Sequence, residues 1–345
     1  MAVDFARSAE FSAAIIDWIR GKGKILIIAH DNPDPDSLAA AFALKQLFWV
    51  KTNVEATVAF GGIIGRGENR VMVRELEIDA LPIEKIDLEE YGVVCMVDTQ
   101  PGTGNNSYPE DREVHIVIDH HPLREATRRC RWFDVREDFG ASATILFEYL
   151  QCQDVYIGTK LATILYYAIK TETQDLGREW NRADRDAYLK LLPLSNNRIL
   201  YEISHPRVPR EYFFVFNLAL ENARIYEQVL VFNLYQIDNP DIVAEMADFL
   251  LRMEGVEVVM GMGCFNEREI LSLRTASFEV VAGEVIHKVV GELGTAGGHN
   301  MTAGAQIVPM QGDKAVQKEL EATLTRRLLE TLQVPIQRGR RLIPA

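Results

Sequence analysis

Residues 25–44 of the chain read ILIIAHDNPDPDSLAAAFAL. The apolar run that opens this stretch predicts a strand covered on both faces, and such strands belong to parallel sheets. One imidazole and three carboxylates follow, before the helix-like Ser37–Leu44. Open α/β folds bind ligands at this carboxyl edge, where crowded carboxylates repel one another and lose hydration unless a cation joins them. The stretch therefore predicts a metal site, and the expected ligands are His30, Asp34 and Asp36.

Two prolines shape the acidic segment. Pro33 and Pro35 fix φ on either side of Asp34. We expect them to hold the loop extended, so that the carboxylates are oriented toward a cation instead of capping the next helix. The plainer alternative is an acid-rich helix start with Asp36 or Ser37 as the N-cap. It explains one acid and leaves the other polar groups without a purpose.

Two further apolar runs end in the same way. Tyr91–Val97 is followed by Asp98, and Val114–Ile118 is followed by Asp119-His120-His121. A single Asp at a strand end is usually a cap or turn residue. Three coincident ends instead favour a site for a hard divalent ion such as Mn²⁺, which accepts carboxylate and imidazole ligands.

These segments resemble a known family. His30–Asp36, Asp98 and Asp119–His121 resemble, in order and spacing, the first three motifs of the DHH phosphoesterase superfamily. Gly140–Thr144 and the apolar residues after it resemble the small-residue turn and helix that follow the third motif. The superfamily includes nano-RNases, 3′-phosphoadenosine 5′-phosphate phosphatases and RecJ-like nucleases. The resemblance implies a metal-dependent phosphoesterase.

The C-terminal part resembles the DHHA1 domain. Leu271–Thr275 is similar to its substrate strand, and Gly297–Gly304 to its Gly-Gly-His loop. Two positions depart from the family pattern. Glu172 stands where the fourth motif usually has Asp, so the second metal is held differently or more weakly, or Asp175 replaces it through a shifted loop. Ala296 replaces the first glycine of the C-terminal loop, which creates strain if that position needs φ > 0.

The resemblance implies a role for each matching residue. One metal would be bound by His30, Asp34 and Asp98, and a second by Asp36, Asp98, His120 and Glu172. The catalytic pair would be His121, which contacts the phosphate or assists the leaving group, and Asp119, which orients an imidazole. The substrate phosphate would be bound by Arg274, Gly297, Gly298 and His299. The implied cofactor is Mn²⁺, two per subunit, with Mg²⁺ or Co²⁺ as alternatives, and the implied site is the cleft between the domains.

The order of elements predicts an α/β fold. Apolar strand-like runs alternate with helix-like runs, which indicates a mostly parallel sheet in an N-terminal DHH domain over 1–194. Apolar residues at helical spacing predict a helical connector over 195–238. A smaller α/β DHHA1 domain is expected over 239–345. The expected strands of the first domain are 25–29, 55–60, 93–97 and 114–118, and its expected helices include 37–50 and 142–150.

Composition narrows the class of protein. The chain has 345 residues, of which 48% are hydrophobic, enough for two cores. Its four cysteines lie far apart without a Cys-x-x-Cys pair, which argues against a disulfide framework or a zinc finger. No apolar run reaches the length of a membrane span and no signal-peptide pattern is evident, so we expect a cytoplasmic protein without a membrane partner.

The net charge of −13 bears on the substrate. Proteins that hold long nucleic acids neutralise many phosphates with Lys and Arg, so no binding to a long duplex is expected here. The leading hypothesis is hydrolysis of short oligonucleotides or linear dinucleotides to nucleoside 5′-monophosphates. Alternatives are a phosphatase for 3′-phosphoadenosine 5′-phosphate, a catalytically weak nucleotide-binding sensor and, ranked low, an inorganic pyrophosphatase. Association of the chain into a homodimer is left open.

Overall fold

The computed structural model describes residues 5–298, 300–308, 314–336 and 338–343. The chain divides into two compact units, Met1–Pro206 and Arg207–Ala345, and each is described by itself. Within the described residues, every helix is too short or too polar to cross a membrane.

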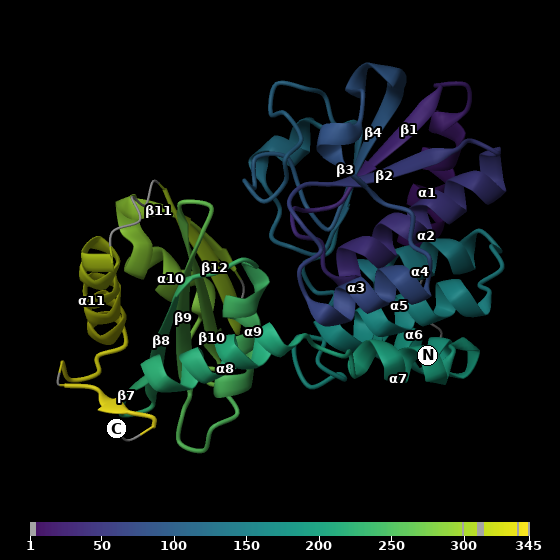
Figure 1. Cartoon of the computed structure of the whole chain (residues 1–345). Helices are drawn as coiled ribbons and strands as arrows, with labels where there is room; N and C mark the ends of the chain where they lie inside the picture. The colour runs from purple at the N-terminus through teal and green to yellow at the C-terminus, as the bar shows by residue number, and fades with distance from the viewer. Residues whose placement is uncertain (1–4, 299, 309–313, 337, 344–345) are drawn as a thin grey trace. The chain divides into compact units, whose positions relative to one another are not determined.

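The N-terminal unit is built on a six-stranded parallel sheet (Figure 1). Its strands are β1 (Lys24–Ile28), β2 (Ala56–Phe60), β3 (Leu81–Pro82), β4 (Tyr91–Val97), β5 (Ile116–Asp119) and β6 (Trp132–Val135). The strand order is β3-β2-β1-β4-β5-β6, so the chain reverses its direction of travel across the sheet between β1 and β4. The predicted parallel sheet is confirmed, and ligand sites of open α/β sheets lie at such a reversal.

Both faces of this sheet are covered, which explains the continuous apolar runs. Because alternate residues of a strand point to opposite faces, Ile25 and Ile27 pack toward the helices. Leu26 and Ile28 pack under residues such as Tyr108 from the loops on the other face. The helices of the unit are α1 (Ala6–Ile19), α2 (Pro35–Thr52), α3 (Gly67–Glu75), α4 (Ser142–Cys152), α5 (Thr159–Glu172), α6 (Arg182–Leu191) and α7 (Asn197–Ser204).

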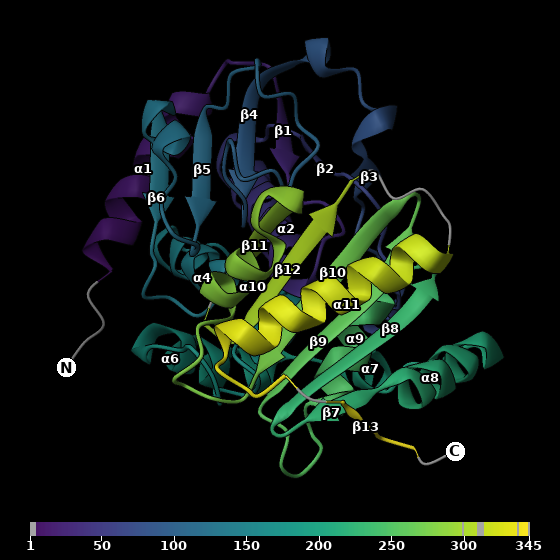
Figure 2. The same ribbon diagram turned by 90° about the vertical axis from the view of Figure 1, so that its left-hand side faces the viewer.

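The C-terminal unit has a seven-stranded mixed sheet in the order β11-β12-β10-β9-β8-β7-β13. Its strands are β7 (Arg224–Tyr226), β8 (Val229–Gln236), β9 (Val258–Phe265), β10 (Arg268–Thr275), β11 (Gly294–Gly298), β12 (Thr302–Ile307) and β13 (Arg340–Arg341). β8 and β9 are parallel and the other neighbours antiparallel. Its helices are α8 (Arg210–Asn222), α9 (Asp241–Leu250), α10 (Ala282–Val290) and α11 (Lys314–Thr331). α10 and α11 cover one face, and α8 and α9 the other (Figure 2).

The helical connector predicted over 195–238 is helical only in its first part. α7 and α8 lie within it, but the chain then forms β7 and β8, and β8 lies inside the second sheet. The prediction was wrong there because β8 is buried on both faces: Val231 packs with α10 and α11, and Phe232 packs with α8 and α9. A short apolar run of this kind fits helical spacing as well as it fits a strand.

Candidate metal centre

The register of the parallel sheet brings the three acidic strand ends together. Ile28 of β1 pairs with Met96 of β4, so His30 and Asp98 each lie two residues beyond a matched pair. Val97 pairs with Ile118 of β5, which sets Asp98 beside Asp119. Asp98 has a φ of 56°, a left-handed conformation that is uncommon for a residue with a side chain and that often marks functional sites.

The first group of candidate ligand atoms comes from His30, Asp34 and Asp98. Nδ1 of His30 lies 2.9 Å from the carbonyl oxygen of Asp31, which leaves Nε2 facing the carboxylates. That Nε2 atom is 3.5 Å from Oδ2 of Asp34 and 3.6 Å from Oδ2 of Asp98. One ligand atom from each of the three residues lies within 4.8 Å of the others, a spacing that suits a single cation.

Asp34 also caps α2, contrary to the expectation that the prolines prevent this. Its Oδ1 accepts a hydrogen bond of 2.9 Å from the backbone N–H of Ser37, while Oδ2 faces His30. Pro35 is the first residue of the helix, where it needs no N–H partner. One oxygen of the Asp34 carboxylate therefore caps the helix, while the other faces the candidate site. The capping hydrogen bond fixes the orientation of the side chain.

His120 lies on the other side of Asp98. Its Nδ1 is 3.1 Å from the carbonyl oxygen of Phe139, and its Nε2 is 3.5 Å from Oδ1 of Asp98 and 3.9 Å from Oδ2 of Asp36. Asp98, His120 and His121 form a second group of ligand atoms within 4.8 Å of one another. Asp98 is therefore shared by both groups.

The start of α4 holds Asp36 in place. The two oxygens of its buried carboxylate accept hydrogen bonds from the backbone N–H groups of Ser142 and Ala143, at 2.7 and 2.8 Å. The Ser142 hydroxyl donates to Oδ1 of Asp98 at 3.0 Å. Free N–H groups at a helix N-terminus suit an anion, so this small-residue segment orients two of the candidate ligands.

Asp119 organises the tandem histidines. It is fully buried, and its Oδ1 accepts hydrogen bonds from the backbone N–H groups of His120 and His121 at 2.8 and 3.2 Å. The same oxygen lies 2.8 Å from Nδ1 of His121. This contact turns Nε2 of His121 away from Asp119, as expected for a carboxylate that orients an imidazole.

Gln100 is a buried residue of this network that the motifs did not single out. Its Nε2 donates to Oδ2 of Asp119 at 2.7 Å. Its Oε1 accepts from the backbone N–H of Arg124 at 2.9 Å and from the hydroxyl of Thr127 at 2.8 Å. Gln100 thus fixes the orientation of Asp119, and the only sequence signal for it is its place two residues after Asp98.

We expect Gln100→Glu to lower kcat/KM by roughly 10- to 100-fold, the usual cost of disturbing the hydrogen bonds that surround a metal site. The variant places two carboxylates against each other across a 2.7 Å contact. The double variant Gln100→Glu/Asp119→Asn restores one donor and one acceptor and should recover part of the activity. Steady-state kinetics with the exposed Gln151→Glu as a control measures this coupling. Purely additive losses would contradict the assigned contact.

Glu172, the last residue of α5, lies next to the two groups but belongs to neither among the described residues. Its Oε1 is 3.9 Å from Nη2 of Arg178. Burial raises its pKa, and Asp34 raises it further. The alternative ligand, Asp175, lies elsewhere: its side chain is 59% exposed and contacts the hydroxyl of Tyr188 and the ammonium of Lys170. Of the two, only Glu172 is positioned near the candidate ligands.

The electrostatics of the cluster fit a divalent cation. Burial and then neighbouring carboxylates raise the pKa values of Asp36 and Asp98 well above the usual range. Burial lowers the pKa of His120 to about 4, so its imidazole is neutral at pH 7 and able to bind a metal. Burial opposes a charge on His30, but Asp34 outweighs it and raises the pKa to about 9. Carboxylates that cannot all ionise without added positive charge are a donor set for hard cations.

The candidate phosphate-binding residues lie in the C-terminal unit. Nε of Arg274 donates to Oδ1 of Asp248 at 2.6 Å, and Nη1 donates to the carbonyl of Leu273 at 3.0 Å. Gly298 ends β11 so close to β12 that a Cβ atom there would lie 2.4 Å from Cα of Ala303. Gly297 precedes it in β11, and the predicted His299 lies outside the described residues.

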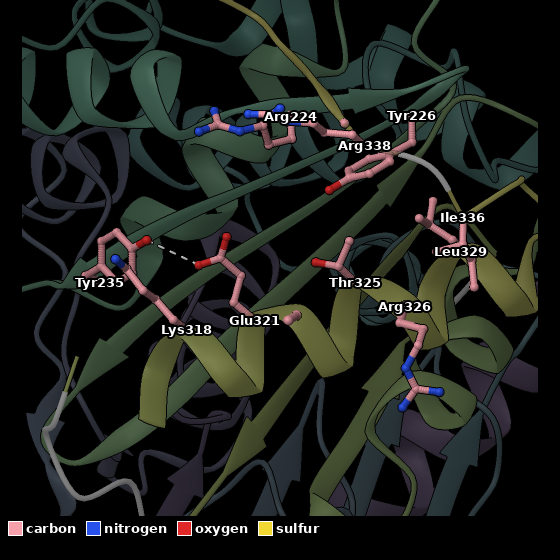
Figure 3. A pocket seen from close by; sticks show the side chains of 12 residues that line it. Arg224, Tyr226, Tyr235, Lys318, Glu321, Thr325, Arg326, Leu329, Ile336 and Arg338 are labelled. Atoms are coloured by element: carbon pink, nitrogen blue, oxygen red, sulfur yellow. Dashed lines mark hydrogen bonds between the residues drawn. The ribbon is translucent and has the colours of Figure 1, made fainter. Parts of the chain in front are cut away.

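Ala296 shows none of the backbone strain that a positive φ would cause at this position. It pairs with Ala305 as a regular residue of the β11–β12 ladder, and it packs against the core between the sheet, α10 and α11. A cavity of 440 Å³ in the same unit, between α11 and residues such as Tyr226 and Tyr235, contains none of the candidate site residues (Figure 3).

Comparison with known proteins covers both units. The DHH family, N-terminal domain, matches residues 24–169, and the DHHA1 domain matches residues 226–325. An uncharacterised protein of Methanocaldococcus jannaschii is 33% identical over 320 residues, which are 91% of this chain and 65% of that protein. The chain therefore spans less than two thirds of that relative.

Two further similarities differ in how much of the chain they cover. A protein of Staphylococcus haemolyticus named a probable manganese-dependent inorganic pyrophosphatase is 26% identical over 151 residues, 44% of this chain and 48% of that protein. An exopolyphosphatase-related protein from Bacteroides fragilis has the same fold, with a TM-score of 0.74 at 16% identity over 94% of this chain and 97% of that chain. The two matched domains, in this order and with the motif residues gathered at one sheet edge, show that the chain belongs to the DHH/DHHA1 superfamily of phosphoesterase-like proteins.

Proposed function

We propose that this chain is a metal-dependent phosphoesterase that hydrolyses short oligonucleotides or linear dinucleotides to nucleoside 5′-monophosphates. The observation that carries the proposal is the pair of ligand groups that share Asp98 at the carboxyl edge of β1, β4 and β5. Two adjacent cation sites are the arrangement that suits displacement at phosphorus.

The cation expected at these sites is Mn²⁺, because the donors are carboxylate oxygens and imidazole nitrogens without a thiolate. One ion would be held by His30, Asp34 and Asp98, and the other by Asp36, Asp98, His120 and Glu172. When bound, such ions activate water and neutralise charge on the phosphate. A stretch of 151 residues of the chain also resembles a protein named as manganese-dependent.

His121 is the proposed acid. Burial opposes its charged form, but Asp119 outweighs burial and raises the pKa of His121 above its ordinary value. Asp119 accepts a hydrogen bond from Nδ1–H of the imidazolium. The proton on Nε2 is then available to a phosphate or to the leaving oxygen. The role of Asp119 is to keep the ring in this orientation.

The expected substrate is short. A net charge of −13 leaves few cationic contacts for a long strand. The proposed anchors for a terminal phosphate are Arg274, Gly297, Gly298 and His299, all in the C-terminal unit. A pyrophosphatase is less favoured because the similarity to that class covers only 44% of the chain, whereas this chain also has a DHHA1 domain over residues 226–325.

The test is turnover with Mn²⁺ on three substrates: a 5′-phosphorylated dinucleotide, 3′-phosphoadenosine 5′-phosphate and pyrophosphate. We expect the dinucleotide to give the highest kcat/KM, two bound Mn²⁺ per chain by elemental analysis, and loss of activity in excess EDTA. Preference for the bisphosphate would support the phosphatase alternative. Nucleotide binding without turnover would support the sensor. Tightly bound zinc, or full activity in EDTA, would contradict the metal assignment.

A further inference from the structure

Arg178 is a nearly buried cation beside the candidate metal centre. Its side chain is 10% exposed, and Nη2 donates to the carbonyl oxygen of Glu172 at 3.2 Å. The Glu172 carboxylate is 3.9 Å away, too far for a hydrogen bond. Nε is buried and has no hydrogen-bond partner among the residues that the structure describes. A buried guanidinium with an unused donor suggests a ligand, since buried N–H groups are almost always paired.

The loop that carries Arg178 is held in a costly conformation. Gln174, Asp175 and Leu176 follow one another at φ of 49°, 57° and 61°, although side chains rarely tolerate this region and seldom in succession. Hydrogen bonds fix the turn: the N–H of Asp175 donates to the carbonyl of Lys170 at 2.8 Å, and the N–H of Arg178 donates to that of Thr173 at 3.0 Å. The turn returns the chain to the end of α5, next to Glu172.

Glu172 connects this arginine to the candidate ligands. Its carboxylate, on a side chain that is 28% exposed, interacts electrostatically with Asp34, Arg178, His121 and His30. A guanidinium has five N–H donors in a planar fork, which matches the geometry of carboxylate and phosphate groups. A fully hydrated arginine would bind a phosphate weakly. Arg178 is largely desolvated by the fold, so its contact with a phosphate would be stronger.

We propose that Arg178 binds the phosphoryl group that is cleaved or released at the candidate metal centre, an inference that rests on the proposed function. Arg178 then supplies a phosphate contact from the N-terminal unit, in addition to the proposed anchors of the C-terminal unit. Its contact with the carbonyl of Glu172 keeps the guanidinium in place, while Nε and the remaining donors meet the phosphate.

The test is calorimetric binding of adenosine 5′-monophosphate and of adenosine, in saturating Mn²⁺, to the full chain and to Arg178→Gln, Arg178→Lys and Arg185→Gln. Arg185 is a matched control because its side chain is 44% exposed and pairs with Asp186. We expect Arg178→Gln to weaken the binding of adenosine 5′-monophosphate at least tenfold and to raise KM for a dinucleotide by a similar factor. Arg178→Lys should lie between this variant and the unaltered chain, because it keeps the charge and loses the fork. Affinities for adenosine and Mn²⁺ should change less than threefold, and Arg185→Gln should match the unaltered chain.

Several outcomes would overturn the inference. One is monophosphate affinity in Arg178→Gln within threefold of the unaltered chain, and another is an unaltered chain that binds no monophosphate. Mn²⁺ affinity that falls in parallel with monophosphate affinity would show that Arg178 only positions Glu172. If Arg178→Gln does not fold, as judged by circular dichroism, Arg178→Lys decides, and a monophosphate affinity equal to that of the unaltered chain would overturn the inference. A chain that binds the monophosphate but cleaves no phosphodiester would refute the proposed function and leave Arg178 to be judged by binding.

Discussion

Asp98→Ala should lower kcat/KM on a dinucleotide by on the order of 10³-fold or more, equivalent to about 4 kcal/mol of transition-state stabilisation. Asp98 is the residue that the two ligand groups share, with Oδ2 3.6 Å from His30 and Oδ1 3.5 Å from His120. Removal of its carboxylate takes a ligand from both proposed cations at once. Glu172 is a proposed ligand of one cation only and lies outside both groups of ligand atoms, so Glu172→Ala should cost at least ten times less.

The comparison needs controls for folding and for charge. Asp175→Ala deletes a carboxylate from the loop after Glu172, but Asp175 is exposed and contacts Tyr188 and Lys170, so activity should be kept. Burial and nearby acids raise the folded-state pKa of Asp98 above its unfolded value, so its ionisation destabilises the metal-free fold at neutral pH. Metal-free Asp98→Asn should therefore melt at or above the temperature of the metal-free parent. Equal kcat/KM for Asp98→Ala and Glu172→Ala would rule out the shared role of Asp98.

The predicted site depended on local sequence and on one property of parallel sheets. Each of the three acidic segments directly follows a buried strand, and parallel strands place their carboxyl ends at the same edge. Once β1, β4 and β5 are neighbours, His30, Asp98 and Asp119 must be close together. The uninterrupted apolar runs likewise predicted that both sheet faces are covered. Ile27 and Leu26 point to opposite faces, and burying each of them is favourable.

What the sequence did not reveal depends on contacts between distant segments. Asp36 is held by the start of α4, more than a hundred residues later, and Gln100 acts through Asp119 on a neighbouring strand. Nothing in the residues around Gln100 or Arg178 distinguishes them from surface polar residues. The capping by Asp34 differs from the expectation for another reason: a carboxylate has two oxygens, so one can cap a helix while the other faces a cation.

Turnover should fall as the substrate grows beyond about five nucleotides, a limit taken from the family resemblance and from the few cationic contacts of an acidic chain. The proposed metal ligands and the proposed phosphate anchors belong to different units of the chain. A short substrate needs few cationic contacts, and a chain with a net charge of −13 offers few. Each further nucleotide adds a phosphate that such a chain does not neutralise. Equal rates from a dinucleotide to a 24-mer with the same 5′ end would contradict this length limit.

Arg274→Ala should lower kcat/KM for the dinucleotide by on the order of 10²-fold, since a charge-assisted contact worth roughly 3 kcal/mol is lost. Arg268→Ala is the matched control, because Arg268 lies on the same strand with an exposed side chain near Gln306. Loss of the Asp248 ion pair also affects stability, so Asp248→Asn separates that effect: it removes the negative charge that faces Nε and keeps the guanidinium. If Asp248→Asn loses as much activity as Arg274→Ala at full folding, the ion pair and not a phosphate contact explains the effect of Arg274, and the anchor must be sought elsewhere on the C-terminal sheet.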